Sequence, residues 1–423
     1  MKSLYKKVII KSLKKARLGQ LNLSLTDGDS IVCGQPDGKK IQNLYVHSDA
    51  FFNELAHKGG IGLGEAYQKR CWSSDDLTGT LEWLLINSKY IAPSTSPYFA
   101  SLIRKVNSLA TGLLHYRNRN NVEGSRNNIH AHYDLGNRFY QTFLDPSLTY
   151  SSGYFESSET RLEEAQAEKY DRLCRKLGID STSHILEIGC GWGGFAIYAA
   201  KHYDCCITGT TISKEQFDRA TQRVKEEGLE HRIDITMTDY RKLQGTYNRI
   251  VSIEMLEAVG QEFMGEYFKQ IEALLEPNGL AGIQVITCPN PLYEAYKDRV
   301  DWIQKHIFPG SHLPSTHVLL ENAEKSGQLD LYHMESFGLH YARTLREWRN
   351  RFLDQWDEIE KMGFDDFFKR KWEYYLAYCE AGFLQRHVNV CQLVFGRADE
   401  TAYQFEQKQN TSRSERPELT QAI

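Results

Sequence analysis

The chain has 423 residues, which is enough for two or three domains and excludes a short peptide or a small disulfide-stapled module. Hydrophobic residues make up 41% and charged residues 25% of the sequence, and these ordinary proportions exclude global disorder. Lys and Arg total 51 against 55 Asp and Glu, so the net charge of -4 offers no overall attraction for nucleic acid.

The cysteines and the hydropathy pattern limit where the protein is expected to work. Nine cysteines occur without a Cys-x-x-Cys pair, which indicates a reducing cytosol. No apolar run is long enough to span a bilayer, and no signal-peptide core is visible, so we expect membrane contact only from the inner face, as a peripheral protein. No group of ligands has metal-binding spacing, and His306, His312 and His317 are expected at the surface.

The first 20 residues are basic and interleave apolar side chains, with no acid before Asp27. On a helix this pattern suits anionic lipid headgroups, and a solvated terminal helix is the equally weighted alternative. Residues 21–115 mix short strand-like runs with helices, which predicts a small α+β domain. Residues 116–129 are polar enough to predict a linker, and residues 401–423 are expected to form a disordered tail.

The segment from residue 130 to residue 400 alternates helical and buried strand-like runs. Strands are expected at 184–188, 205–209, 233–237, 249–253, 281–286, 329–335 and 388–394. Helices are expected at 162–177, 194–202, 214–227 and 262–275, with two long helical stretches between the last two strands. This succession predicts an α/β fold with a doubly wound, mostly parallel seven-stranded sheet covered on both faces.

A buried strand at 185–188 runs into the glycine-rich turn 189–194, which opens a helix. Glycine allows the backbone to approach a ligand closely, and ligands of open α/β sheets bind beyond the carboxyl ends of the strands. The spacing alone fits a dinucleotide, another nucleotide-like ligand or merely a tight turn.

The ends of the neighbouring strands favour S-adenosylmethionine over a dinucleotide. A dinucleotide fold usually carries an acid about 20 residues after the glycine turn, whereas hydroxyls at 210–213 and the amide of Gln216 stand there. The next strand ends in 239–241, where the Asp239 carboxylate can accept from an adenine amino group and the Tyr240 ring can stack beside it. Glu187 precedes the turn and can orient it. Singly, each residue could equally be structural.

Residues 132–397 resemble the cyclopropane-fatty-acyl-phospholipid synthases. The motifs that carry the resemblance are HYDLGN at 132–137, LTYSSGYF at 148–155, the glycine turn, GTTIS at 209–213, MLEAVG at 255–260, IFPG and LPS within 307–315, and the segment 374–383. Residues 60–67 more weakly resemble that family's smaller lipid-facing domain. The resemblance implies a class I methyltransferase of Rossmann-like fold that adds a methylene to the double bond of acyl chains in membrane phospholipids.

The resemblance also implies roles in cofactor binding. Tyr150 and Ser151 would hold the methionine carboxylate, Gly189 would lie against the methionine part, Thr211 and Gln216 would contact the ribose, and Asp239 and Tyr240 the adenine. The complete set of expected cofactor-binding residues is Tyr150, Ser151, Glu187, Gly189, Gly191, Gly193, Thr210, Thr211, Ser213, Gln216, Asp239, Tyr240 and Arg241.

The family holds a bicarbonate ion beside the reacting methyl group as general base. Its cradle corresponds here to Ser152, Glu257, Gln284, Tyr341 and Cys379, which are the expected catalytic residues. The best-known bacterial members have Cys and His where this chain has Ser152 and Gln284. Ser152 still offers its backbone N–H and Gln284 a hydrogen-bond donor, but an amide cannot titrate. A methyl or methylene branch without ring closure therefore stays open as the product.

Several further expectations concern the substrate and partners. Electron-rich rings near the site could stabilise a carbocation, and the candidates are Tyr133, Phe155, Tyr341, Tyr375 and Phe383. The expected partners are an unsaturated phospholipid at the membrane surface and anionic lipid headgroups, with no nucleic acid. A homodimer is a further option. Methylation of a soluble small molecule, or a catalytically silent lipid-binding scaffold, remain the alternatives.

Overall fold

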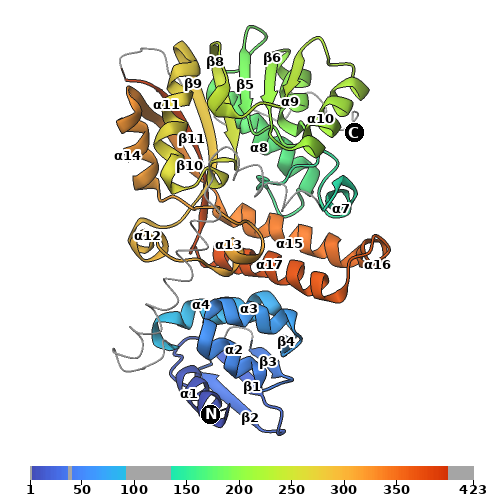
Figure 1. The fold of residues 1–423 in the computed structure, drawn as a ribbon, viewed down its shortest axis with the longest axis vertical. Coiled ribbons are helices and arrows are strands. Elements are labelled where there is room, and N and C mark those ends of the chain that lie inside the picture. The colour runs from blue at the N-terminus through green and yellow to red at the C-terminus, as the bar shows by residue number, and fades with distance from the viewer. Residues whose placement is uncertain (1, 37–40, 92–134, 399–423) are drawn as a thin grey trace.

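The computed structural model describes residues 2–36, 41–91 and 135–398. Figure 1 shows a small N-terminal lobe and a larger α/β domain stacked along the long axis, with two long helices of the larger domain lying between the lobe and the sheet. The linker expected at 116–129, the tail expected at 401–423 and Tyr133 lie outside the described residues.

The N-terminal lobe is built on a four-stranded sheet in the order β2-β1-β3-β4. β1 pairs antiparallel with β2 and parallel with β3, and β4 pairs antiparallel with β3. The strands are β1 (Gln20–Ser24), β2 (Ser30–Gly34), β3 (Gln42–Val46) and β4 (Trp72–Ser74), and the helices are α1 (Lys2–Leu13), α2 (Ala50–Lys58), α3 (Gly60–Gln68) and α4 (Leu77–Ile91).

Helix α1 belongs to the packed core of this lobe. Ile9 and Leu13 are buried and contribute to the same apolar cluster as Leu21 and Leu23 of β1. The basic residues Lys7, Lys11 and Lys14 lie on the exposed side of the helix and of the turn that follows it. The basic segment is therefore attached to the lobe through its apolar face, while several of its cations face solvent.

The larger domain contains a seven-stranded sheet in the order β10-β11-β9-β8-β5-β6-β7. The strands from β9 to β7 pair in parallel, and β11 pairs antiparallel with both β9 and β10. The strands are β5 (His184–Ile188), β6 (Cys206–Thr210), β7 (Ile233–Thr236), β8 (Tyr247–Ile253), β9 (Leu275–Thr287), β10 (Leu329–Ser336) and β11 (Asn389–Arg397). The expected mostly parallel, doubly wound fold is confirmed.

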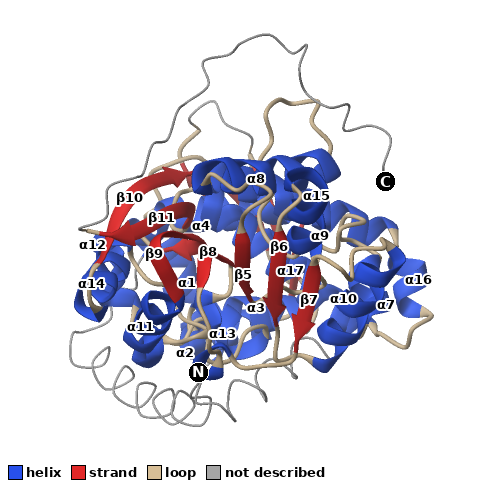
Figure 2. Cartoon of the chain, turned by 90° about the horizontal axis from the view of Figure 1, so that it is seen from above, coloured by secondary structure: helices blue, strands red, loops and turns tan. Residues whose placement is uncertain are grey.

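Helices cover both faces of this sheet (Figure 2). The helices of this domain are α7 (Asn137–Gln141), α8 (Leu162–Leu177), α9 (Gly194–Tyr203), α10 (Lys214–Glu226), α11 (Met264–Leu274), α12 (Asn290–Tyr296), α13 (Trp302–His306), α14 (Thr316–Ser326), α15 (Gly338–Asp354), α16 (Trp356–Glu360) and α17 (Asp366–Leu384), with single 3-10 turns at Tyr240–Lys242, Leu256–Ala258 and Gln261–Phe263.

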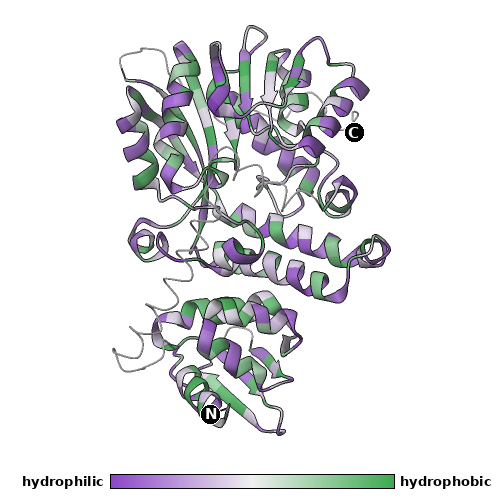
Figure 3. Cartoon of the chain, viewed as in Figure 1, coloured by the Kyte–Doolittle hydropathy of each residue, from purple (hydrophilic) through white to green (hydrophobic). Residues whose placement is uncertain are grey.

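The two faces of the sheet have separate cores because successive side chains of a strand point to opposite sides. Ile250 of β8 packs in the cluster with α11, whereas its neighbour Val251 packs with α8 and α9. Figure 3 shows hydrophobic colouring along the central strands and mixed colouring on the covering helices. Such strands, buried on both faces, read as continuous apolar runs in the sequence, which is why they were predictable.

The N-terminal lobe docks on α15 and α17. Glu380 of α17 is buried and accepts hydrogen bonds from Thr78 Oγ1 of α4 at 2.8 Å and from Arg346 Nε of α15 at 2.7 Å. Tyr67 of α3 donates to Glu373 at 2.8 Å. Within the described ranges, no helix is both long enough and apolar enough to cross a bilayer.

Candidate functional site

A cavity of about 530 Å³ opens at the carboxyl ends of β5, β6 and β8. Its volume lies in the usual range of small-molecule sites, and its position is where open α/β sheets bind ligands. It is lined at one end by the glycine turn and at the other by α15, α17 and Leu85 of α4 in the N-terminal lobe. The cavity therefore extends from the sheet to the lobe.

The glycine turn folds over the end of β6. The backbone N–H groups of Gly189 and Cys190 both donate to the Thr210 carbonyl at 2.9 Å. Gly189 has a positive φ of 81°, and a Cβ there would lie 2.7 Å from Cγ of Met255. Gly191 also has a positive φ, of 52°, and borders the cavity. Gly193 caps α9 and does not line the cavity.

Glu187 of β5 places a carboxyl group in the floor of the cavity. Its Oε2 is buried and has no hydrogen-bond partner among the described residues. Burial raises the pKa of this carboxyl to about 8, although Lys169 acts in the opposite direction. A buried polar atom normally has a partner, so this oxygen suits a ligand that brings a cationic donor, such as the ammonium group of S-adenosylmethionine.

Two polar pairs stand beyond β6 and β7. Thr211 Oγ1 donates to Gln216 Oε1 at 2.8 Å, and the Ser213 hydroxyl accepts from the Gln216 backbone at 3.3 Å as the N-cap of α10. Asp239 pairs with Arg241 through Nε to Oδ1 at 2.9 Å and Nη2 to Oδ2 at 2.6 Å. Burial of Asp239 opposes ionisation, but the Arg241 bonds lower its pKa overall. Arg241 thus favours the ionised form of Asp239, and the Asp239 carboxylate still has lone pairs that can accept from a ligand.

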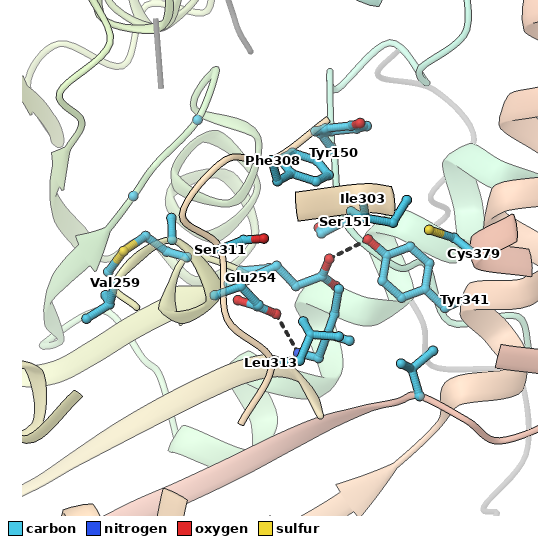
Figure 4. A pocket seen from close by; sticks show the side chains of 18 of the residues that line it. Tyr150, Ser151, Glu254, Val259, Ile303, Phe308, Ser311, Leu313, Tyr341 and Cys379 are labelled. Carbon is cyan, nitrogen blue, oxygen red and sulfur yellow. Dashed lines mark hydrogen bonds between the residues drawn. The ribbon is translucent and has the colours of Figure 1, made fainter. Parts of the chain in front are cut away.

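The cavity lining also holds a carboxylate that the sequence analysis did not identify. Glu254, directly after β8, accepts on Oε1 from the Ser152 backbone N–H at 3.0 Å and from Gln284 Nε2 at 2.8 Å. On Oε2 it accepts from the Tyr341 hydroxyl at 2.6 Å, and Figure 4 shows this bond. Glu254 has a positive φ of 50°, which is rare for a residue other than glycine.

The residues expected to cradle a bicarbonate ion do not fit one here. The Ser152 amide, the Gln284 side chain and the Tyr341 hydroxyl already donate to Glu254, so an anion at that place would lack these donors and would meet a second carboxylate. The expectation of bicarbonate on this set of donors therefore disagrees with the structure.

Glu257 lies beside this group in a 3-10 turn and lines the cavity. Its Oε1 accepts from the Ile286 backbone N–H at 2.5 Å, and its Oε2 has no partner within the described part of the chain. Burial, followed by the negative charge of Glu254, raises the pKa of Glu257 to about 8. At neutral pH the protonated form of Glu257 is therefore favoured, and it can donate into the cavity.

Gln284 is held by a second amide behind it. Gln392 Nε2 donates to Gln284 Oε1 at 3.0 Å, and Lys176 Nζ donates to Gln392 Oε1 at 2.6 Å. The side-chain oxygen of Gln284 therefore accepts from Gln392, and its NH2 group donates to Glu254. Gln284 is therefore a fixed donor, and neither it nor Ser152 reaches the cavity surface.

The amino group of Lys169, in α8, lies behind the cavity lining next to Ser151. It is fully buried, and its Nζ donates to Ser151 Oγ at 2.7 Å. Burial lowers its pKa to about 7, against the attraction of Glu254, Asp145 and Glu187. Ser151 is thereby oriented from behind while it lines the cavity.

The end of the cavity near α17 is apolar and aromatic. Tyr341 stacks on Phe383 with ring centroids 4.5 Å apart, and the hydroxyls of Tyr150 and Tyr375 lie 2.9 Å apart. Cys379 lines the same space (Figure 4). The other apolar lining residues include Leu85, Ile303, Phe308, Leu313, Leu345, Tyr378 and Val388. Phe155 lies outside the lining, with the guanidinium of Arg343 4.1 Å from its ring centroid.

The structure thus brings most of the expected residues to one cavity. Those that line it are Tyr150, Ser151, Glu187, Gly189, Gly191, Thr210, Thr211, Gln216, Asp239, Tyr240, Arg241, Glu257, Tyr341 and Cys379, while Ser152, Gly193, Ser213 and Gln284 lie behind it. His312 was expected at the surface, which is wrong: it is buried, its Nε2 lies 3.0 Å from the Tyr293 hydroxyl, and its amide donates to the Glu257 carbonyl.

Glu254 is the functional residue that sequence reasoning missed. The signal was present, because an ionisable side chain directly after a buried strand lies at the edge where ligands bind. In the described ranges, no cluster of three or more His, Cys, Asp or Glu has the arrangement of a metal site.

Comparisons with known proteins agree with this fold. The family model described as mycolic acid cyclopropane synthetase matches residues 120–393. Tuberculostearic acid methyltransferase UfaA1 of Mycobacterium tuberculosis is 37% identical over 380 residues, covering 88% of this chain and 86% of the relative. Cyclopropane-fatty-acyl-phospholipid synthase of Escherichia coli K12 is 33% identical over 365 residues, covering 86% of this chain and 90% of the relative.

A solved structure of mycolic acid cyclopropane synthase CmaA1, complexed with SAH and CTAB, superposes with a TM-score of 0.60 at 30% sequence identity. It covers 64% of this chain and 97% of that chain. Because the family model spans more than half of the sequence, the chain is an S-adenosylmethionine-dependent methyltransferase and belongs to the cyclopropane-fatty-acyl synthase family.

Proposed function

We propose that the protein transfers a one-carbon unit from S-adenosylmethionine to the double bond of an unsaturated fatty acyl chain in a membrane phospholipid. The observation that carries this proposal is the continuity of the cavity. One space joins the polar glycine-turn end to an apolar end bounded by α15, α17 and Leu85 of α4. A cofactor and a hydrocarbon chain could meet inside it.

The residues around this space suit such a reaction. When bound, S-adenosylmethionine supplies a methyl group on a positively charged sulfur, which is electrophilic. An isolated alkene is a poor nucleophile, so the chain must hold the two reactants in line and exclude water, and such positioning can contribute roughly 7 to 11 kcal/mol. The rings of Tyr341, Tyr375 and Phe383 face the cavity and can stabilise positive charge on the acyl chain by about 0.5 to 2 kcal/mol each.

Addition of a methylene with closure of a cyclopropane ring is the first candidate for the product. A methylene branch without ring closure is the second candidate. It is favoured because the donors of the expected anion cradle already bond to Glu254. Both products arise from the same transfer and both release one proton, so both require a proton acceptor near the reacting carbon.

The N-terminal lobe supports access from a membrane surface. It contributes Leu85 to the cavity lining, and its helix α1 exposes Leu4 and Val8 beside the exposed cations Lys7 and Lys11. A basic face with apolar side chains binds anionic lipid headgroups. We therefore propose peripheral association with the cytoplasmic face of the membrane.

The test is to incubate the purified full-length protein with S-adenosylmethionine and vesicles of dioleoyl phosphatidylglycerol, then to analyse the lipids by mass spectrometry. We expect a gain of one CH2 unit per modified acyl chain. Proton NMR of the product separates a cyclopropane from a methylene branch, since the two have equal mass. Unchanged lipid in all mixtures would reject the proposal.

Vesicle sedimentation separates this proposal from methylation of a soluble small molecule. At low salt the protein should sediment with anionic vesicles and much less with neutral ones, because the attraction is electrostatic. Protein that stays in the supernatant with both kinds of vesicle would favour the soluble substrate.

A further inference from the structure

We propose that the Glu254 carboxylate replaces the bicarbonate ion of the related synthases and accepts the proton released when the one-carbon unit is transferred. This inference rests on the proposed function for its chemistry. Its structural part, the replacement of a diffusible anion by a side chain, stands on the contacts of Glu254 alone.

The hydrogen bonds of Glu254 are those expected for a bound anion. Both oxygens are engaged by donors, from the Ser152 backbone, the Gln284 amide and the Tyr341 hydroxyl, at 2.6 to 3.0 Å. The resemblance assigned these same three residues to bicarbonate. Because the Gln284 oxygen already accepts from Gln392, its NH2 group must face Glu254 as a donor. All three donors of the cradle therefore have an acceptor, and this acceptor is a side chain of the protein itself.

The backbone supports the same conclusion. Glu254 adopts a left-handed conformation, with a φ of 50°, that favours glycine. Its carboxylate lies in the cavity lining, at the centre of the group in Figure 4. A strained residue persists where its surroundings hold it, and here three hydrogen bonds do so. A tethered carboxylate also has a high effective concentration at the reacting carbon, which a free ion lacks.

The neighbouring acid Glu257 has a different environment. It accepts a backbone hydrogen bond from Ile286 and leaves Oε2 without a partner in the described ranges. The donors therefore gather on Glu254, which marks it as the ionised member of the pair. Burial raises the pKa of Glu254, while Tyr341, Ser152, Gln284 and the charge of Lys169 act to lower it. A carboxylate whose pKa is raised by burial is a stronger base than one in water.

The chemical step balances without an added oxidant or reductant. One alkene carbon bonds to the methyl carbon as the bond from that carbon to sulfur breaks, which releases S-adenosylhomocysteine and leaves the other alkene carbon cationic. For ring closure, a C–H bond of the transferred carbon breaks and its electron pair forms the bond to the cationic carbon. For a methylene branch, a hydride first moves from the methyl-bearing carbon to the cationic carbon, and a C–H bond of the transferred carbon then breaks to form the new double bond. In both cases the proton passes to the Glu254 carboxylate.

The experiment compares wild type, Glu254→Gln, Glu254→Gly and a surface control, Glu230→Gln, in carbonate-depleted buffer. Glu230 is exposed and is not part of the cavity lining. We expect Glu254→Gln to lose roughly 10²- to 10⁴-fold in turnover, as for removal of a general base. Glu254→Gly should lose as much and should recover at least about tenfold when bicarbonate is added, since the cradle donors are then free. Wild type and Glu230→Gln should not respond to bicarbonate.

Thermal melting and S-adenosylmethionine binding show whether each variant is folded, and glycine relieves the left-handed backbone at position 254. Binding of ¹³C-labelled bicarbonate, followed by NMR, gives a result even if no lipid is converted. We expect saturable binding to Glu254→Gly and none to wild type. Bicarbonate binding or a bicarbonate requirement in wild type, full turnover by Glu254→Gln, or neither binding nor rescue in folded Glu254→Gly would overturn the inference. Absence of lipid product with wild type would instead count against the proposed function.

Discussion

Two carboxyl groups border the same cavity and differ in their hydrogen-bond partners. Glu187, at the glycine-turn end, leaves Oε2 without a partner among the described residues. Glu254, directly after the neighbouring strand β8, has both oxygens engaged by Ser152, Gln284 and Tyr341. Both lie in the lining of the cavity.

The difference is between an oxygen that lacks a partner and a carboxylate that other residues of the protein engage on both oxygens. A buried oxygen without a partner costs free energy, which a ligand that donates a hydrogen bond to Glu187 would recover. The Glu254 end is satisfied by the protein itself and is ready before any ligand enters. One end of the cavity therefore depends on what it binds, and the other is preorganised.

The largest expected effect concerns Glu187, whose Oε2 has no partner among the described residues. Glu187→Gln should weaken S-adenosylmethionine binding roughly 10- to 100-fold, because a hydrogen bond to a charged group contributes about 1.5 to 3 kcal/mol. Isothermal titration calorimetry, with Glu230→Gln as the matched surface control, measures the change. An unchanged dissociation constant would show that Glu187 does not contact the cofactor.

The same variant should gain stability without ligand. The pKa of Glu187 is raised from 4.5 to about 8, so between these values the folded state holds a proton that the unfolded state has lost. The wild type therefore loses stability as pH rises through this window, and Glu187→Gln does not. Melting curves of the two proteins should coincide at the acid end and diverge toward pH 8.

The next effect concerns Glu254, whose two oxygens both accept hydrogen bonds. Tyr341→Phe removes one donor from Glu254 and should lower the free energy of unfolding by about 1 to 3 kcal/mol. Because the Tyr341 bond lowers the pKa of Glu254, its loss should raise that pKa further. The rise of kcat with pH should then move to higher pH. Loss of stability without a shifted profile would make Tyr341 merely structural.

The smallest effect compares two glycines of the turn. Gly189→Ala and Gly191→Ala each place a side chain at positive φ, which costs about 1 to 2 kcal/mol. At position 189 the added Cβ also lies 2.7 Å from the Met255 side chain, whereas at 191 nothing lies within 4 Å. Chemical denaturation should therefore show the larger loss for Gly189→Ala. Equal losses would mean that Met255 moves aside freely.

The sequence by itself determined the α/β domain in detail. Helix Leu162–Leu177 and strand His184–Ile188 coincide with their predicted bounds, because an amphipathic period and a continuous apolar run are local properties. The glycine turn was predictable for the same reason, since its glycines and the following helix are adjacent in the chain.

Tertiary structure alone decided which residues surround the Glu254 carboxylate and that His312 is buried. The three partners of Glu254 lie 102, 30 and 87 positions away along the sequence, and no local pattern connects them. A single left-handed residue after β8 turns the carboxylate toward them. Whether a side chain or a free ion occupies such a site depends on contacts that form only when distant strands and helices pack together.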